Sequence, residues 1–193
     1  SEMCIRDSAE AERVWLLPGS GWHRKGLATL LEATALLGDP ELRVWVAGRD
    51  RIGPWKARAR ALGVESRIRF LGERKDLPAV YQAADGMVLP TRYDPFANVT
   101  LEAAAAGLPI VTTAANGAAE WLAGDLEVVE RAEDPHTLAA ALDGYRDASR
   151  RKKAGERLRT RALEMNWPDH VARLRKEYRG ILERRAGRAR VSP

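Results

Sequence analysis

Apolar residues fall into short blocks between residues 14 and 148, and their spacing changes from block to block. Continuous apolar runs such as residues 14–17 are typical of buried strands, whereas residues 27–37 repeat apolar positions at the spacing of a helix. Glycine and proline stand between the blocks and mark turns. The predicted strands are 14–17, 42–47, 67–71, 87–89, 110–112 and 126–129, and the predicted helices are 27–37, 55–62, 77–84, 98–106, 116–122 and 135–148.

Strands and helices alternate in this pattern with short connections. Such alternation indicates parallel strands, because each crossover helix returns the chain to the same end of the sheet. Strands that are apolar throughout also indicate a sheet covered on both faces. We therefore predict an α/β fold, a Rossmann-like, doubly wound parallel sheet of about six strands with helices on both faces.

The segment after residue 149 has a different pattern and holds no predicted strand. Residues 150–164 and 168–185 are predicted to form two C-terminal helices, separated at Asn166-Trp167-Pro168. The second helix carries one apolar stripe, and arginine and lysine cover its other faces. The stripe consists of Val171, Leu174, Tyr178, Ile181 and Leu182.

These patterns divide the chain into four segments. Residues 1–13 are expected to be a non-native or disordered start, because the first eight resemble neither a signal peptide nor a strand. Residues 14–149 form the predicted Rossmann-like domain, and residues 150–186 hold the two C-terminal helices. Residues 187–193 are expected to be a frayed basic tail.

The composition is that of a globular protein with one sizeable core. The chain has 193 residues, of which 45% are hydrophobic and 31% are charged. No apolar run approaches the ~20 residues that a membrane span needs. The single cysteine, Cys4, cannot form an internal disulfide, which agrees with a reducing compartment.

The net charge of +5 is unevenly distributed. Residues 150–190 hold 15 lysines and arginines against 5 aspartates and glutamates, a balance of +10, so the rest of the chain carries −5. The basic character therefore belongs to the C-terminal segment. A solvated helix face explains it better than nucleic acid, which we do not predict as a partner, whereas anionic lipid headgroups could attract such a surface.

The loop at residues 18–26 combines glycines with two cations, Arg24 and Lys25. Its glycines allow close approach of the backbone, but it is neither a Walker A loop nor a Gly-x-Gly-x-x-Gly motif. Cations at a helix start oppose the helix dipole, and a bound anion between them would remove that cost. Without a ligand, the same residues describe a turn with solvated cations.

The loop before residue 98 brings Asp94 to the start of a predicted helix, and Glu102 lies one turn inside that helix. Free N–H groups at a helix start attract anions, and carboxylates accept hydrogen bonds from sugar hydroxyls. The combination suggests a ligand with both phosphate and sugar. By spacing alone, an Asp favoured by the dipole and an exposed Glu would also be an ordinary arrangement. A third loop, residues 112–120, could border the same crevice, although an ordinary strand-to-helix connection describes most of its residues better.

Residues 92–113 resemble the acid-x7-Glu signature of the family 4 retaining glycosyltransferases and the segment that follows it. Residues 24–26 resemble the Lys-Gly turn of the same family. The resemblance extends over about residues 14–182 and implies the C-terminal, donor-binding domain of the two-domain GT-B architecture. Within the family, residues 94–99 and 115–118 are similar to the lipopolysaccharide core glucosyltransferases.

The resemblance implies roles for individual residues. Lys25, with Arg24, would hold the donor pyrophosphate and stabilise the departing nucleotide, and Asp94 would accept hydrogen bonds from the donor sugar. These three are the predicted catalytic residues, and Glu102 would bind the ribose. Backbone contacts to the donor are predicted at Gly19, Phe96, Ala97, Asn98, Val99 and Arg69, the last of these beside the base.

Two departures from the family's pattern bear on these roles. The first acid of the family is usually Glu, so Asp94 is one methylene shorter and has less reach. The family's usual Gly-Arg is Gly19-Ser20 here, and Arg24 would replace the missing cation. No Asp-x-Asp occurs in the chain, and we predict neither a metal nor a cofactor besides the nucleotide-sugar donor.

The resemblance implies the donor-binding half of a retaining hexosyltransferase. It would move a hexose from a nucleotide diphosphate sugar, above all UDP-glucose, to a lipopolysaccharide-core or other glycan acceptor. An N-terminal domain outside this chain would bind the acceptor, and the C-terminal helices of residues 150–186 would pack back on it. Without that domain the chain is expected to be inactive. The expected location is the cytoplasm, with peripheral contact to the inner face of the membrane.

Two other functions remain open at this stage. One is a sugar-nucleotide epimerase of GT-B architecture, against which the acid-x7-Glu helix argues. The other is a module without activity that binds nucleotide sugar or an anionic membrane.

Overall fold

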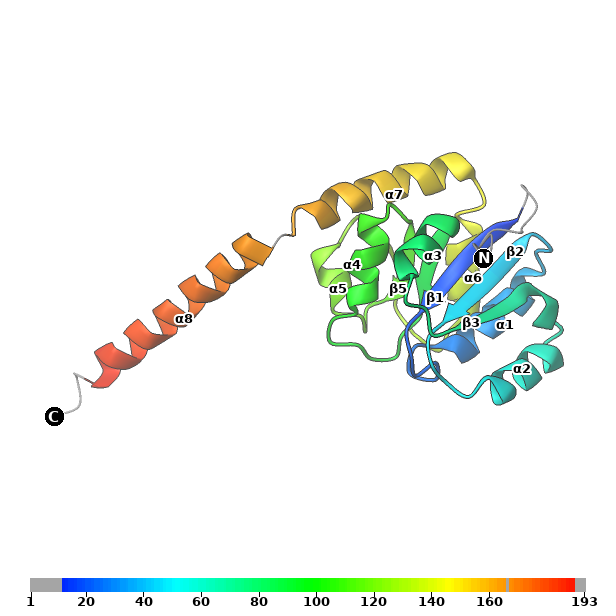
Figure 1. The fold of residues 1–193 in the computed structure, drawn as a ribbon, viewed down its shortest axis with the longest axis horizontal. Coiled ribbons are helices and arrows are strands. Elements are labelled where there is room, and N and C mark those ends of the chain that lie inside the picture. Colours follow the sequence, from blue (N-terminus) through cyan, green and yellow to red (C-terminus); the bar gives the residue numbers. More distant parts are fainter. Residues whose placement is uncertain (1–11, 166, 190–193) are drawn as a thin grey trace. The chain divides into compact units, whose positions relative to one another are not determined.

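The computed structural model describes residues 12–165 and 167–189 (Figure 1). Most of the expected disordered start, residues 1–13, therefore lies outside the described part of the chain. Arg13 already belongs to the first strand. Residues 190–193, the end of the expected frayed tail, also lie outside the described residues.

A sheet of six strands, all parallel, lies at the centre of the fold (Figure 1). Its order is β3-β2-β1-β4-β5-β6, so the chain adds strands outward from β1 on one side and then from β4 on the other. This doubly wound order confirms the predicted fold class. The strands are β1 (Arg13–Pro18), β2 (Leu42–Ala47), β3 (Ile68–Gly72), β4 (Gly86–Leu89), β5 (Ile110–Thr113) and β6 (Glu127–Val129).

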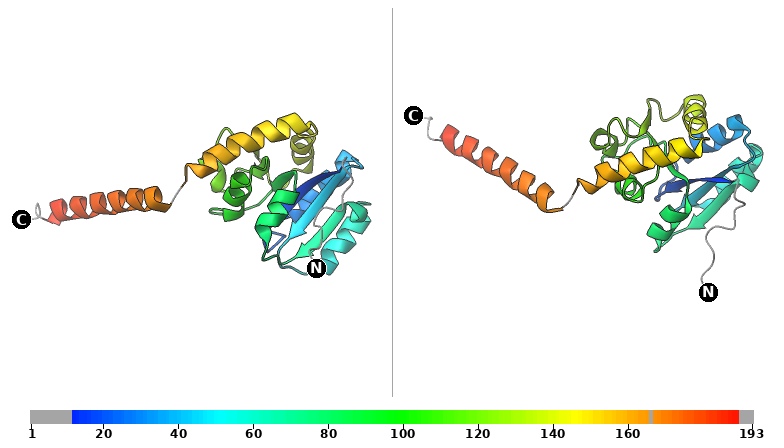
Figure 2. Two further views of the ribbon diagram at one scale, coloured as in Figure 1. Left: turned by 45° about the horizontal axis from the view of Figure 1, so that its top comes forward. Right: turned by 90° about the horizontal axis from the view of Figure 1, so that it is seen from above.

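Helices cover both faces of the sheet (Figures 1 and 2). One hydrophobic cluster joins the strands to α1, α2 and α6, and a second joins them to α3, α4 and α7. A short α5 and a 3₁₀ turn, η1, complete the connections. The helical bounds are α1 (Leu27–Leu37), α2 (Ile52–Ala61), η1 (Glu65–Arg67), α3 (Leu77–Ala83), α4 (Asn98–Ala105), α5 (Ala118–Trp121), α6 (Pro135–Asp143), α7 (Ala148–Leu163) and α8 (Trp167–Ala189).

The central strand β1 shows why its sequence is apolar throughout. Trp15 and Leu17 belong to the cluster with α1, whereas Val14 and Leu16 belong to the cluster with α4. Successive side chains of a strand point to opposite faces, so a strand buried on both sides needs apolar residues at every position.

Within the sheet domain, the start of α2 and the end of α6 differ most from the prediction. α2 begins at Ile52 rather than at residue 55, because Pro54 fits inside a first turn, where its missing N–H loses no hydrogen bond. α6 ends at Asp143 rather than at residue 148. The chain then packs Tyr145 into the core, where its ring meets the edge of Trp15 with centroids 5.8 Å apart.

The division between the two units of the chain falls after Ala162 rather than after residue 149. Helix α7 belongs to the first unit, because Leu158 is fully buried and Ala154 is 2% exposed against the sheet domain. A Cβ atom on Gly155 would lie 1.9 Å from the carbonyl oxygen of Gly107, so glycine is what allows this close contact. Helix α7 therefore packs on the sheet domain, and a contact of the C-terminal helices with an N-terminal domain stays a prediction.

Helix α8 belongs to the second unit, and its bounds extend past residue 186, where the frayed tail was expected to begin. Its predicted apolar stripe is exposed, with Val171 38% and Leu182 65% accessible. Packing of this stripe on an N-terminal domain stays a prediction. Among the described residues, no helix is both long and apolar enough to cross a bilayer.

Candidate functional site

Successive strands are added in one direction from β1 and in the opposite direction from β4. These two strands are parallel neighbours, so they end at the same edge of the sheet. The loop of residues 19–26 leads from β1 into α1 on one face. The loop of residues 90–97 leads from β4 into α4 on the other face. Ligands of open α/β sheets bind where two such loops diverge, and most of the predicted site residues lie in these loops.

Three of the predicted residues meet in one ion-pair cluster. Asp94 Oδ2 accepts hydrogen bonds from Lys25 Nζ at 2.7 Å and from Arg24 Nη1 at 2.9 Å. The side chains of Lys25 and Asp94 are only 7% and 11% exposed, whereas that of Arg24 is 47% exposed. One buried carboxylate is thus the counter-ion of two cations, and the net charge of the cluster is +1.

The environment of Asp94 favours its charged form. Burial by itself would raise the pKa of this carboxyl, but the hydrogen bonds and charges of Lys25 and Arg24 outweigh burial and hold the pKa below its ordinary value. Asp94 Oδ1 also accepts a hydrogen bond from the Phe96 N–H at 3.3 Å. Asp94 is therefore ionised throughout the physiological pH range.

The first two loops are held together by backbone contacts. Gly26 has a φ of +79°, and a Cβ atom there would lie 1.9 Å from the carbonyl oxygen of Pro90. Arg24 O accepts hydrogen bonds from the Arg92 N–H at 2.9 Å and from Thr91 Oγ1 at 3.1 Å. These contacts fix the position of the two cations relative to Asp94.

Gly19, another predicted site residue, also lies beside the cluster. A Cβ atom at Gly19 would approach Lys25 Cε to 3.3 Å, and the φ of Gly19 is +105°. The glycine therefore leaves room for the Lys25 side chain and keeps its own backbone open toward the ammonium group.

The start of α4 carries most of the predicted backbone contacts. Ala97 is its N-cap, and no side chain caps the helix with a hydrogen bond. The Ala97 N–H is directed to Asn116 Oδ1 at 3.4 Å, whereas Asn98 and Val99 open the helix itself. An uncapped helix start presents N–H groups and the positive end of the dipole to an anion.

The third loop, residues 112–120, lies beside this site and contacts it through Asn116. Asn116 is fully buried, and its Nδ2 donates to Thr100 Oγ1 at 2.9 Å and to Thr112 Oγ1 at 3.0 Å. The backbones of residues 94 and 116 form a parallel bridge. The sequence predicts only that a helix begins at Asn116, because Ala97 and Thr100, with which its side chain also bonds, come from another segment.

Gly117 also holds the third loop against the loop that carries Asp94. Its N–H donates to Asp94 O at 2.9 Å, and a Cβ atom there would lie 1.9 Å from Pro95 O. Only a glycine lets the third loop approach the Asp94 backbone so closely.

Glu102, the predicted ribose ligand, has a partner that sequence reasoning missed. Its Oε2 accepts a hydrogen bond from Tyr81 Oη at 2.9 Å. Tyr81 comes from α3 and is 3% exposed, whereas Glu102 is exposed on α4. Tyr81 looks like core in the sequence, and no spacing signal joins α3 to α4.

Arg69 lies apart from the other predicted residues. It pairs in register with Trp45 within β3 and β2, and its guanidinium lies 5.9 Å from the centroid of the Trp45 ring. Its side chain lines a cavity of about 190 Å³ with Glu12 and Arg43, which precede or begin the first two strands. The structure does not bring the Arg69 side chain to Lys25, and a contact between its backbone and a base stays a prediction.

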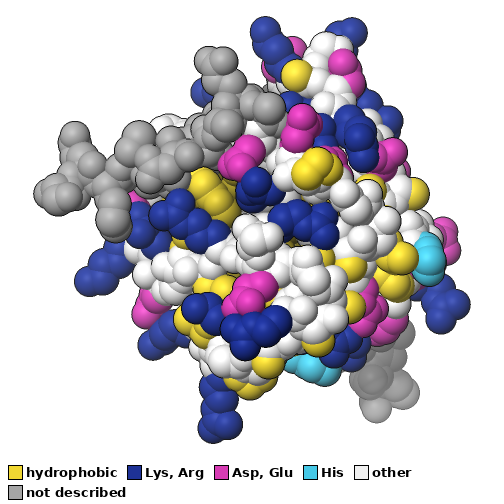
Figure 3. Space-filling model, turned by 90° about the vertical axis from the view of Figure 1, so that its right-hand side faces the viewer, with side chains coloured by type: hydrophobic (Ala, Val, Ile, Leu, Met, Phe, Trp, Pro, Cys, Tyr) yellow, Lys and Arg dark blue, Asp and Glu magenta, His cyan; other side chains and the backbone are white. Residues whose placement is uncertain are grey.

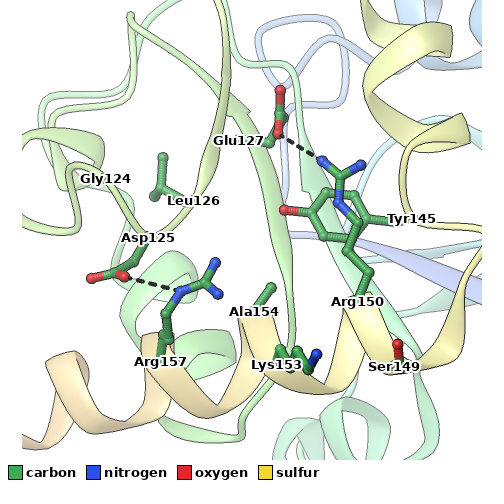
Figure 4. A pocket seen from close by; sticks show the side chains of 10 residues that line it. All are labelled: Gly124, Asp125, Leu126, Glu127, Tyr145, Ser149, Arg150, Lys153, Ala154 and Arg157. Atoms are coloured by element: carbon green, nitrogen blue, oxygen red, sulfur yellow. Dashed lines mark ion pairs between the residues drawn. The ribbon is translucent and has the colours of Figure 1, made fainter.

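A second cavity, of about 390 Å³, lies beside the start of β6 and holds none of the predicted residues (Figure 4). Arg150, Lys153 and Arg157 extend into it from α7. Arg150 lies 3.7 Å from Glu127 and Arg157 lies 3.4 Å from Asp125. Two of its three cations thus form ion pairs with acids that line the same cavity.

Charges of both signs are mixed on the face shown in Figure 3, where lysine and arginine stand beside aspartate and glutamate. No cluster of three or more His, Cys, Asp or Glu with a metal-binding arrangement occurs among the described residues, and metal independence stays a prediction.

The profile of the family described as Glycosyl transferases group 1 matches residues 12–145, which include the whole ion-pair cluster. The chain belongs to this family. The match confirms the family that residues 24–26 and 92–113 predicted.

Two curated relatives from this comparison differ in their activities. Lipopolysaccharide glucosyltransferase WaaG of Escherichia coli K12 is 36% identical over 118 residues, which cover 59% of this chain and 31% of WaaG. D-inositol 3-phosphate glycosyltransferase of Corynebacterium glutamicum is 33% identical over 168 residues, which cover 80% of this chain and 40% of that enzyme. The chain spans less than half the length of either relative.

Solved structures agree with this relationship. The crystal structure of WaaG has a TM-score of 0.75 and 29% identity, over 82% of this chain and 44% of that chain. HepE of Anabaena, in complex with UDP-glucose, has a TM-score of 0.72 at 21% identity, over 83% of this chain and 45% of its own, which shows likeness of fold. The chain is thus a glycosyltransferase domain of GT-B type related to the lipopolysaccharide core glucosyltransferases.

Proposed function

We propose that this domain binds the nucleotide-sugar donor of a retaining hexosyltransferase, with UDP-glucose as the donor. The acceptor would be a lipopolysaccharide-core sugar or another glycan, held by a partner domain that this chain needs for activity. The relationship to WaaG supports the glucosyl transfer, and the UDP-glucose complex of HepE supports the donor class.

The cluster of Arg24, Lys25 and Asp94 at the switch point of the sheet carries this proposal. In the transfer, the bond between the sugar C1 and the β-phosphate oxygen breaks, and a bond to the acceptor oxygen forms. Negative charge then develops on the departing nucleotide. The two cations and the start of α4 are already positioned to stabilise that charge, so they need no reorganisation during the reaction.

The free protein uses Asp94 as the counter-ion of both cations. A bound pyrophosphate would take over this role, because it offers more negative charge to the same two groups. Asp94 would then accept hydrogen bonds from hydroxyl groups of the donor sugar. We further propose that the donor is the only small molecule required and that no metal takes part.

Calorimetric titration of the purified chain with UDP, UDP-glucose, GDP-mannose and ADP-heptose tests the proposal. We expect binding of UDP and tighter binding of UDP-glucose than of the other two sugars. Failure of all four ligands to bind would contradict donor binding. Preference for another nucleotide sugar would contradict UDP-glucose while leaving the donor site in place.

An epimerase would use the same kind of site, but its product distinguishes it from a transferase. Full-length enzyme is incubated with UDP-glucose, without acceptor, and the sugar is examined by NMR for inversion of a hydroxyl-bearing carbon. We expect no epimer. Appearance of an epimer at a steady rate would replace the transferase proposal.

We also propose peripheral contact with the inner face of a membrane, at the cytoplasmic side. Helix α7 supports this proposal, because its Lys152 side chain is 79% exposed. Anionic headgroups attract such groups within a Debye length. Co-sedimentation with anionic vesicles should exceed that with neutral vesicles and fall with salt, whereas equal sedimentation with both would contradict the contact.

A further inference from the structure

Tyr81 and Glu102 form a hydrogen-bonded pair that joins α3 to α4, and the first residue is buried whereas the second is exposed. The Tyr81 ring is buried, with 3% of the residue exposed, and its Oη donates to Glu102 Oε2 at 2.9 Å. A second contact of Tyr81 Oη, to Val99 O, is 3.5 Å long and hence weak. The carboxylate is thus the principal acceptor for this buried hydroxyl.

The phenol is a permanent donor in this setting. Burial, and then the charge and hydrogen bond of Glu102, raise the pKa of Tyr81 far above its ordinary value. Its partner, in contrast, is a long flexible side chain on the exposed side of α4. Without a fixed donor, such a glutamate would occupy several rotamers, and a ligand would have to order it on binding.

We propose that Tyr81 is a positioning residue, which holds the Glu102 carboxylate ready to accept the hydroxyls of the donor ribose. The inference rests on the proposed function and extends it to a residue outside the three loops. A carboxylate has about four acceptor positions. Tyr81 occupies one of them, so the others stay available for the two ribose hydroxyls.

The test compares wild type with Tyr81→Phe, Glu102→Ala and the double variant by calorimetric titration. The ligands are UDP, 2′,3′-dideoxy-UDP and inorganic pyrophosphate, of which only UDP has ribose hydroxyls. We expect Tyr81→Phe to weaken UDP about three- to tenfold, because the loss of one hydrogen bond to a charged group leaves Glu102 disordered. Binding of dideoxy-UDP and pyrophosphate should change less than about twofold.

The double variant decides whether Tyr81 acts through Glu102. In the Glu102→Ala background, Tyr81→Phe should cause no further loss of UDP affinity, because the group it positions is gone. Additive losses would overturn the proposal, as would equal weakening of UDP and pyrophosphate. Tyr145→Phe, at a second buried tyrosine (4% exposed) outside the donor loops, is the matched control and should leave all three affinities unchanged.

A second variant keeps the test decisive if Tyr81→Phe does not fold. Glu102→Asp retains the charge at an exposed position but is one methylene too short to keep the hydrogen bond to Tyr81. It should show the same selective loss for UDP, and unchanged UDP affinity would overturn the proposal. Failure of the proposed function has a different signature, namely that wild type binds neither UDP nor pyrophosphate.

Discussion

Lys25 and Asp94 depend on each other because both side chains are nearly enclosed, at 7% and 11% exposure. Removing one partner of such a pair leaves the other charge poorly solvated. Arg24 differs, because its guanidinium reaches the same carboxylate from a half-exposed position. The two cations are therefore not equivalent, because the Lys25 side chain is much more enclosed than that of Arg24.

We predict that Lys25→Ala weakens binding of UDP and UDP-glucose by a similar factor, about 10- to 100-fold, because both ligands carry the same diphosphate. Isothermal titration measures the two affinities. Lys153→Ala, in the cavity beside β6, is the matched control and should leave both unchanged. A loss confined to UDP-glucose would contradict a phosphate role for Lys25.

The stability contributed by Asp94 should depend on pH. Because its pKa is lowered in the folded protein, its ion pairs stabilise the fold above the unfolded value of about 3.9 and lose this effect as the pH falls through the lower folded pKa. We predict that the stability advantage of wild type over Asp94→Asn, measured by urea unfolding, shrinks between about pH 5 and pH 2. A difference that is constant over this range would contradict the prediction, and Glu130→Gln, at an exposed acid, serves as the control.

At the scale of elements, three loops from three strands act as one body. Gly26 and Gly117 set how closely they approach, because a Cβ atom at either position would lie 1.9 Å from a carbonyl oxygen of the middle loop. The fully buried Asn116 then links the third loop to the start of α4. The geometry of the site therefore resides in contacts between loops rather than within any one of them.

Gly26→Ala and Gly21→Ala form a matched pair that tests this view. Both glycines have positive φ, +79° and +76°, but a Cβ atom at Gly21 meets nothing within 4 Å. We predict that Gly21→Ala costs about 1–2 kcal/mol of unfolding free energy through backbone strain alone. Gly26→Ala should cost clearly more and also weaken UDP binding, and equal losses in urea unfolding would contradict the prediction.

Helix α7 differs from α8 in what its leucines contact. Leu158 of α7 is fully buried, whereas Leu174 of α8 is 41% exposed. We predict that Leu158→Ala lowers the unfolding free energy by about 2–5 kcal/mol and that Leu174→Ala changes it by less than about 0.5 kcal/mol. Similar effects of the two changes would show that α8 packs against something in solution.

At the scale of the whole molecule, the donor-side domain is complete without the second unit. Among the described residues, every strand, both hydrophobic clusters and the ion-pair cluster lie before Leu163. We predict that a chain ending at Ala162 unfolds with the same midpoint as the full chain and binds UDP with the same affinity. Denaturation and titration of the two chains check this, and a lower midpoint or weaker binding would assign a stabilising contact to residues 163–193.

Much of this protein was determined by its sequence alone. The apolar blocks define the alternating strands and helices, because periodicity depends on neighbours within a few residues. Lys25, Arg24, Asp94 and Glu102 could be chosen as candidates, because residues 24–26 and 92–113 resemble the motifs of the family. The family could be predicted as well, since residues 92–113 carry its signature.

Only the tertiary structure decided which of these groups meet. Lys25 and Asp94 are 69 residues apart, and Tyr81 and Glu102 are 21 apart, on separate elements in both cases. Their contacts follow from the strand order and from how closely three loops can approach at two glycines. The same holds for α7, whose sequence resembles that of α8 in charge but whose small residues fit against the Gly107 turn. Local sequence cannot specify such contacts, because they arise from the packing of segments that are distant along the chain.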